Sequence, residues 1–301
     1  MSLCILCPGQ GSQTTDMLPR LLAEPLIASH LSALFSGMPF DALAVAKNPE
    51  LNSMNSHAQP LIVAVGAAVT QALKAQGIRA DLSAGYSIGE LTAHVVAGSV
   101  RPLDAITLAV QRAQCMDHAA PAAYGMMAVK GIRLEKLQSI AQQHGLAVAI
   151  VNDEQHAVLA GPTAVMKSIC KAMERELGAH VVHLNVQVPS HTPWLIDATV
   201  AYRTALQAAF WNNFECPVLS ALDGSPVESR TEAIDCLARQ ISEPLNWART
   251  LDLAAEMGAT VYFEVGPGNT LTRMVRERFP NVKARSLSEF QTLEGALNWL
   301  N

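Results

Sequence analysis

The segment Gly85–Gly89, which reads Gly-Tyr-Ser-Ile-Gly, constrains the fold of this 301-residue chain more than any other short segment. It lies between residues 80–86, a run typical of a buried strand, and residues 88–97, a run typical of a helix. Flanking glycines let a chain turn sharply from a strand into a helix, and this turn exposes a serine at its tip. The segment therefore predicts an α/β fold and makes Ser87 the candidate nucleophile.

The same alternation of strands and helices recurs elsewhere in the chain. Residues 3–7 indicate a buried strand that ends in a glycine loop, and residues 56–76 indicate a buried helix. Residues 261–265 indicate another strand, followed by the loop Gly266-Pro267-Gly268. Strands that alternate with helices favour a mostly parallel sheet, so we expect one large α/β domain.

The middle third of the chain has a different order of elements, strand-helix-strand-strand-helix-strand. This order is typical of a ferredoxin-like domain. The expected strands and helices are 126–131, 134–143, 147–151, 156–160, 162–177 and 181–186. We therefore predict a small inserted domain at residues 123–188, and one discontinuous large domain formed by residues 1–122 and 189–301.

Composition excludes several classes of protein. A net charge of −5 argues against a general nucleic-acid binder, and the longest apolar stretch, residues 61–69, is too short to span a membrane. Six cysteines do not suggest a disulfide framework, and Cys4 and Cys7 lie inside an apolar run, where we interpret them as buried small hydrophobic residues. We predict a cytoplasmic protein with no metal, no permanently bound cofactor, and no nucleic-acid or membrane partner.

A serine nucleophile needs a base and a group that stabilises the oxyanion. Of nine histidines, His191 stands out because it lies at the junction back from the small domain, where loops line clefts, although spacing alone does not choose among the nine. The predicted turn also places the backbone N–H of Ile88 at a helix N-terminus, where it is free to face a developing oxyanion.

Arg112 has two interpretations that the residues alone do not separate. A lone arginine on a helix is usually a solvated or salt-bridged surface group. The alternative is a bidentate clamp on a substrate carboxylate.

Six motifs, in order, resemble those of the malonyl-CoA:acyl carrier protein transacylases. They are Pro8-Gly9-Gln10-Gly11-Ser12-Gln13, Gly85-x-Ser87-x-Gly89-Glu90, Gln111-Arg112 with Met116, Val188-Pro189-Ser190-His191, Arg239-Gln240-Ile241 and Glu264-Val265-Gly266-Pro267-Gly268. The resemblance implies an α/β-hydrolase-like large domain with an inserted ferredoxin-like small domain. It also implies malonyl-CoA as the substrate and an acyl carrier protein as the partner.

The resemblance further implies roles for single residues. Ser87 corresponds to the nucleophile, and His191 to the general base and then acid. Gln240 corresponds to the position that orients the histidine, where a hydrolase would use Asp or Glu.

Four residues correspond to the binding positions of the family. Gln10 and Ile88 match the backbone donors of the oxyanion hole. Arg112 matches the clamp on the free malonyl carboxylate, and Met116 matches the residue that accompanies it in the substrate site.

Two positions depart from the family pattern. Tyr86 replaces the usual histidine before the nucleophile, and Gly-Tyr-Ser-x-Gly-Glu resembles the transacylase (epsilon) subunit of bacterial biotin-independent malonate decarboxylases, which loads a carrier subunit bearing a phosphoribosyl-dephospho-CoA arm. Because of Tyr86 we favour a role in malonate decarboxylase over one in fatty-acid synthesis. Asn269 stands where many fatty-acid enzymes have a basic residue, so a contact with CoA phosphates is in doubt there.

Two other functions stay open. A serine esterase or thioesterase requires an acidic third residue between Ser87 and the histidine, and Asp104, Asp117 and Asp153 all satisfy that order. A carrier-docking module that has lost catalysis is the non-enzymatic alternative, which the intact Ser87, His191 and Arg112 argue against.

Overall fold

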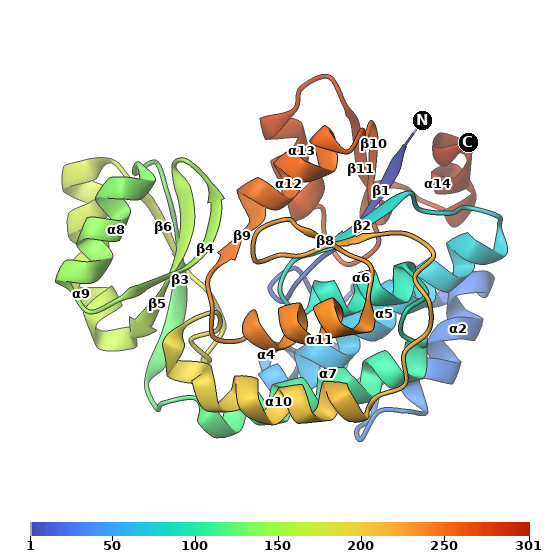
Figure 1. The fold of residues 1–301 in the computed structure, drawn as a ribbon, viewed down its shortest axis with the longest axis horizontal. Helices are drawn as coiled ribbons and strands as arrows, with labels where there is room; N and C mark the ends of the chain where they lie inside the picture. The colour runs from blue at the N-terminus through green and yellow to red at the C-terminus, as the bar shows by residue number, and fades with distance from the viewer. Residues whose placement is uncertain (1) are drawn as a thin grey trace.

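The computed structural model describes residues 2–301 and contains two sheets (Figure 1). The first sheet has six strands in the order β11-β10-β1-β2-β7-β8, and every neighbouring pair is parallel except β7 and β8. The strands are β1 (Leu3–Cys7), β2 (Leu82–Gly85), β7 (Val218–Leu219), β8 (Pro226–Val227), β10 (Val261–Glu264) and β11 (Lys283–Ser286). The predicted mostly parallel sheet is confirmed.

Helices cover both faces of this sheet because successive strand side chains point to opposite sides. Cys7 faces one apolar core and Cys4 faces the other, and both thiols are fully buried, as predicted. The first face carries α5 (Asn55–Ala75), α6 (Gly89–Val96), α7 (Pro102–Ala119) and α10 (Ile196–Ala208), and the second carries α12 (Trp247–Glu256) and α13 (Thr270–Arg278).

The other helices extend these two layers. They are α1 (Met17–Leu22), α2 (Pro25–Phe35), α3 (Ala42–Lys47), α4 (Pro49–Ser53), α11 (Arg230–Arg239), α14 (Leu293–Leu300) and the 3-10 turns η1 (Pro193–Leu195) and η2 (Leu287–Glu289). The apolar stretch 61–69 belongs to α5. This helix is long and apolar enough to cross a membrane, but 83% of its most apolar 18-residue segment is buried inside the protein. Burial among neighbouring helices accounts for its composition.

The second sheet has five strands in the order β6-β3-β5-β4-β9. Its first four strands are β6 (His180–His183), β3 (Tyr124–Lys130), β5 (His156–Pro162) and β4 (Ala147–Asp153), which pair antiparallel, and α8 (Leu134–Gln143) and α9 (Thr163–Leu177) pack on its outer face. This is the ferredoxin-like arrangement predicted for the middle third.

The fifth strand, β9 (Leu245–Asn246), comes from beyond residue 188 and pairs parallel with β4. Trp247 follows it directly and lies in one apolar core with residues of both sheets. The division at residues 123–188 therefore remains a proposal, because the second sheet borrows a strand from outside that range.

Candidate functional site

The turn that carries Ser87 is held by close packing of backbone against backbone. A Cβ atom at Gly85 would lie 2.1 Å from the backbone nitrogen of Glu90, and one at Gly89 would lie 2.1 Å from the carbonyl oxygen of Cys7. Both contacts are too short for any side chain, so the two glycines are required. Ser87 itself has φ 56°, a left-handed conformation that holds its side chain at the tip of the turn.

His191 meets Ser87 across 104 residues of sequence, and its Nε2 lies 2.8 Å from the Ser87 Oγ. His191 also has a left-handed backbone, with φ 63°, and its N–H donates to the carbonyl of Ile241 at 2.8 Å. The structure thus brings the predicted nucleophile and base into hydrogen-bonding distance, and the junction loop places the imidazole there.

The backbone carbonyl of Gln240, not its side chain, hydrogen-bonds the Nδ1 of His191. The resemblance gives Gln240 the position that orients the histidine, and in the structure its backbone carbonyl makes that contact, whereas both side-chain polar atoms of Gln240 are buried without a partner among residues 2–301. A carbonyl only accepts, so Nδ1 carries the proton and Nε2 is free to accept from Ser87. Gln240 caps the C-terminus of α11, where unpaired carbonyls and the helix dipole favour a developing positive charge.

The electrostatic surroundings keep His191 neutral. Burial, and then the positive charge of Arg112, lower the pKa of His191 to about 3, and the hydrogen bond to Gln240 opposes that shift. At neutral pH the imidazole is therefore unprotonated and able to act as a base.

Replacing Gln240 with methionine tests which part of this residue matters. We expect the acylation rate of Ser87 to stay within about threefold of the wild type, because the carbonyl that holds His191 is unchanged. Removing the unpaired buried amide should also stabilise the protein by about 1 kcal/mol. Single-turnover acylation and thermal unfolding measure both effects. A hundredfold slower acylation would assign the histidine-orienting role to the amide after all.

Arg112 is not a solvated surface group. Its side chain is 1% exposed on α7, its Nη1 donates to Gln59 Oε1 at 2.8 Å, and its Nη2 lies 3.4 Å from Ser87 Oγ. Its Nε has no partner among residues 2–301. Burial lowers the pKa of Arg112 to about 10, with Tyr202 and Glu90 acting in the opposite direction, so the guanidinium keeps its charge at neutral pH. A buried cation with unused donors beside the nucleophile is suited to an anionic acyl group.

Gln59 is a site residue that sequence reasoning missed. It lies on α5, where its Oε1 accepts from Arg112 and its Nε2 reaches the Sδ of Met116 at 3.6 Å and the Oδ1 of Asn55. Met116 therefore supports the arginine through Gln59. The signal available in the sequence was a glutamine early in an otherwise apolar helix, which gives no indication of its partner.

The two expected oxyanion donors lie at the ends of adjacent parallel strands. Gln10 follows β1, and Ile88 follows β2, and the Cα atoms of Cys7 and Gly85 are paired in register between these strands. Within residues 2–301 neither backbone N–H donates to another protein group. The side chain of Gln10 is tied back, with Nε2 2.9 Å from the Ser53 carbonyl, which fixes the loop that carries its N–H.

Among residues 2–301 no carboxylate takes the place of an acidic third residue on His191, whose Nδ1 is bonded to the Gln240 carbonyl. Asp104 pairs with Arg101 on the surface, and Asp117 accepts from Asn55 at 2.9 Å. Asp153 lies 4.0 Å from His156. The triad expected of an esterase is therefore wrong for all three acidic candidates.

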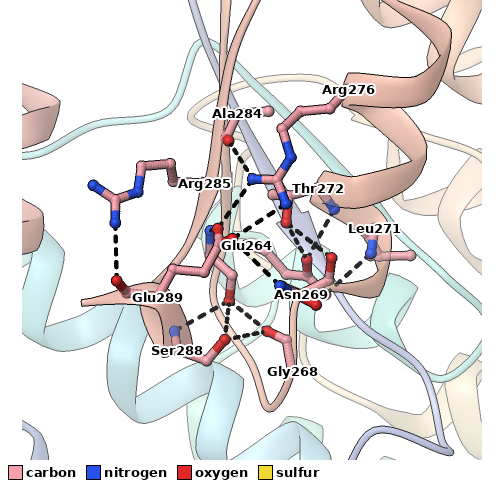
Figure 2. Close-up of polar contacts among 11 residues, drawn as sticks. Glu264, Gly268, Asn269, Leu271, Thr272, Arg276, Ala284, Arg285, Ser288 and Glu289 are labelled. Carbon is pink, nitrogen blue, oxygen red and sulfur yellow. Dashed lines mark hydrogen bonds and ion pairs between the residues drawn. The ribbon is translucent and has the colours of Figure 1, made fainter. Parts of the chain in front are cut away.

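The residue that departs from the family near the C-terminus, Asn269, is committed to a local network (Figure 2). Its Nδ2 lies 3.3 Å from Glu289 Oε1, which also accepts from Arg276 at 3.1 Å. Glu264 accepts from the backbone N–H of Thr272 at 2.9 Å and fixes the start of α13. Asn269 thus shapes its loop, and the amide is occupied within the protein.

A cleft of ≈ 580 Å³ opens beside Gln10, between residues of the first sheet's layers and residues next to the second sheet. Amide, hydroxyl and apolar groups line it, and within the described part of the chain Asp117 is the one charged residue in the lining. The lining includes Ser53, Asn55, Ser56, Tyr124, Thr163, Asn185 and Gln187. This lining suits a neutral, hydrogen-bonding chain better than a phosphate group.

Comparisons with known proteins place the chain in a family and match its fold. The family described as Acyl transferase domain matches residues 5–291. A protein of Escherichia coli (strain K12) named malonyl CoA-acyl carrier protein transacylase is 28% identical over 300 residues, covering 96% of this chain and 97% of the relative. A Synechocystis protein of the same name is 26% identical over 289 residues, covering 95% and 97%. The crystal structure of MCAT from Mycobacterium tuberculosis superposes with a TM-score of 0.90 at 28% identity and covers 100% of both chains.

Proposed function

Because this chain belongs to the acyl transferase domain family, we propose that it transfers a malonyl group from malonyl-CoA to the prosthetic-group thiol of an acyl carrier protein, through an ester on Ser87. One observation carries the proposal: Ser87 Oγ lies 2.8 Å from a neutral histidine and 3.4 Å from a buried arginine. The first arrangement activates a hydroxyl, and the second suits an acyl group that ends in a carboxylate. Relatives named for this activity support it.

Acylation begins when His191 Nε2 takes the Ser87 proton as Oγ attacks the thioester carbonyl. The resulting oxyanion accepts from the backbone N–H groups of Gln10 and Ile88, and one such donor is worth about 3 kcal/mol. The carbonyl of Gln240 stabilises the imidazolium that forms. The proton on Nε2 of His191 then passes to the sulfur of the departing CoA, which leaves malonyl esterified to Ser87.

Transfer reverses these steps with a different thiol. His191 takes the proton of the carrier thiol, whose sulfur attacks the ester, and then returns a proton to Ser87 Oγ. Water competes with the thiol at this stage, so the site must exclude water to avoid becoming a thioesterase. The half-buried position of Ser87, and a backbone carbonyl rather than a carboxylate on His191 within the described residues, support transfer.

The identity of the carrier is the finer part of the proposal. The names of the relatives favour an acyl carrier protein of the fatty-acid-synthesis type, whereas Tyr86 alone favours the carrier subunit of malonate decarboxylase. The prosthetic arm of either carrier would enter through the cleft beside Gln10. We therefore rank the fatty-acid-type carrier first, because its support comes from relatives that match nearly the whole chain, whereas the decarboxylase carrier is supported by Tyr86 alone.

Incubation of the purified protein with malonyl-CoA tests the proposal. We expect a malonyl adduct on Ser87 by intact mass and peptide mapping, little release of malonate, and rapid loss of the adduct when a carrier is added. Two carriers should be compared, one bearing 4′-phosphopantetheine and one bearing a phosphoribosyl-dephospho-CoA arm. Transfer to the second alone would assign the decarboxylase pathway, and rapid hydrolysis without any carrier would indicate a thioesterase.

A further inference from the structure

Tyr86, the residue directly before the nucleophile, connects the two sheets. Its backbone belongs to the first sheet, since its N–H donates to the Cys7 carbonyl at 2.9 Å and its carbonyl accepts from Gly89 at 3.0 Å. Its phenol OH lies 3.1 Å from Oδ1 of Asn152, which is on β4 of the second sheet and is 5% exposed. We infer that Tyr86 is a positioning residue, which fixes the Ser87 turn relative to the second sheet through its hydrogen bond to Asn152.

The direction of this hydrogen bond follows from the next contact. The Nδ2 of Asn152 can only donate, and it lies 3.4 Å from Nε2 of His156, so that ring nitrogen accepts, while the other ring nitrogen, Nδ1, faces the Asp153 carboxylate at 4.0 Å. The Asn152 oxygen is then the atom that faces Tyr86, and the phenol must donate. Each group in the series has its hydrogen-bonding role set by its neighbour, which gives the Tyr86 side chain a single favoured orientation.

A second contact, with an aromatic ring, also holds the phenol ring of Tyr86. The ring packs edge to face on Trp247, with centroids 5.3 Å apart and planes at 75°. Trp247 begins α12 directly after β9, the strand that pairs with β4 next to Asn152. The hydroxyl of Tyr86 therefore reaches β4 of the second sheet, and its ring packs on the residue that directly follows β9, so the turn that holds Ser87 cannot shift without disturbing both contacts.

The consequence for the reaction is geometric. Ser87 Oγ must keep its 2.8 Å distance to His191, and misplacement of a reacting group by about 1 Å costs on the order of 10² in rate. The inference rests on the proposed role of Ser87 as the nucleophile, but not on malonyl as the acyl group. It assigns a reason for the tyrosine at a position where the related transacylases usually have histidine.

Tyr86→Phe tests the inference because it keeps the ring against Trp247 and removes only the hydroxyl. The readout is the burst of p-nitrophenolate from p-nitrophenyl acetate, whose amplitude counts functional sites and whose rate constant reports acylation of Ser87. We expect a rate constant about tenfold lower than in the wild type. Tyr262→Phe is the matched control: this buried tyrosine of β10 has a hydroxyl without a partner among residues 2–301, and the rate should not change.

A double variant separates positioning from stability. Tyr86→Phe leaves the Asn152 oxygen buried and unpaired, so combining it with Asn152→Leu removes both partners of this bond and should recover part of the lost melting temperature, although Nε2 of His156 then loses its contact with Asn152. The acylation rate should stay low, because the connection is still missing. A wild-type rate in Tyr86→Phe, or a rate that recovers together with the melting temperature, would overturn the inference. A wild-type burst without any malonyl adduct from malonyl-CoA would instead count against the proposed function alone.

Discussion

Replacing Ser87 with alanine is expected to abolish the acyl-enzyme and to lower malonyl transfer by on the order of 10⁴–10⁶-fold. The loss is this large because His191, the oxyanion donors and Arg112 all act on an acyl group that Ser87 must first receive. Serine and alanine both have a Cβ atom, so alanine adds little strain at the left-handed backbone of position 87, where φ is 56°, and the fold should be kept. Intact mass after incubation with malonyl-CoA measures the adduct, and circular dichroism checks the fold.

Ser83→Ala provides the matched control for this substitution. Ser83 is a buried serine of the same strand, β2, and its hydroxyl donates to the Ala93 carbonyl at 3.2 Å, away from His191. Its variant should form the adduct at the wild-type level. An adduct that persists in Ser87→Ala would show that another group is the nucleophile, and peptide mapping would locate it.

The elements with a strong repeating pattern could be predicted from the sequence. The strand at residues 3–7 and the helix at residues 134–143 have the predicted bounds, because an apolar run or a helical period marks each of them clearly. The two-residue strands β7, β8 and β9 could not be predicted. Strands this short have no period of their own: β7 and β9 form on the edges of the longer strands β2 and β4, and β8 pairs with β7 in turn.

The site was predictable to the extent that its chemistry depends on side-chain identity. Ser87 is marked by its glycines, whereas His191 was chosen by its place at a junction and by resemblance. The contribution of Gln240 was beyond prediction from residue type, because every residue has a backbone carbonyl and only the packing of α11 shows which one meets Nδ1 of His191. Gln59 was hidden for a similar reason, since its partner Arg112 lies on another helix.

Tyr86 shows a third kind of limit. Its effect depends on Asn152, a residue of the other sheet, and on a strand, β9, that joins that sheet from far along the chain. A single sequence shows that Tyr86 departs from the family pattern, but it does not show that Asn152 is its hydrogen-bonding partner. Coupling of this kind becomes visible only once the two sheets are placed against each other.

Arg112→Ala should change which acyl group the enzyme accepts. We expect malonyl transfer to fall by about 10²–10³-fold and acetyl transfer by less than about tenfold, because only malonyl has a carboxylate that loses a buried, charged partner. Arg112→Lys keeps the positive charge but not the planar pair of donors, so its malonyl rate should lie between those of the wild type and the alanine variant. Adduct formation with malonyl-CoA and with acetyl-CoA, measured on the same preparation, gives the ratio directly.

The ratio is informative because Arg112 has two contacts that could each explain a loss. Its Nη1 bond to Gln59 is structural, and removing it affects both acyl groups alike, whereas the unused donors near Ser87 matter only for an acyl group that ends in a negative charge. Arg79→Ala, at an exposed arginine that bonds only backbone carbonyls, controls for the loss of a positive charge as such. Equal losses for malonyl and acetyl in Arg112→Ala would therefore assign this arginine to holding the site together and would remove the carboxylate clamp from the proposal.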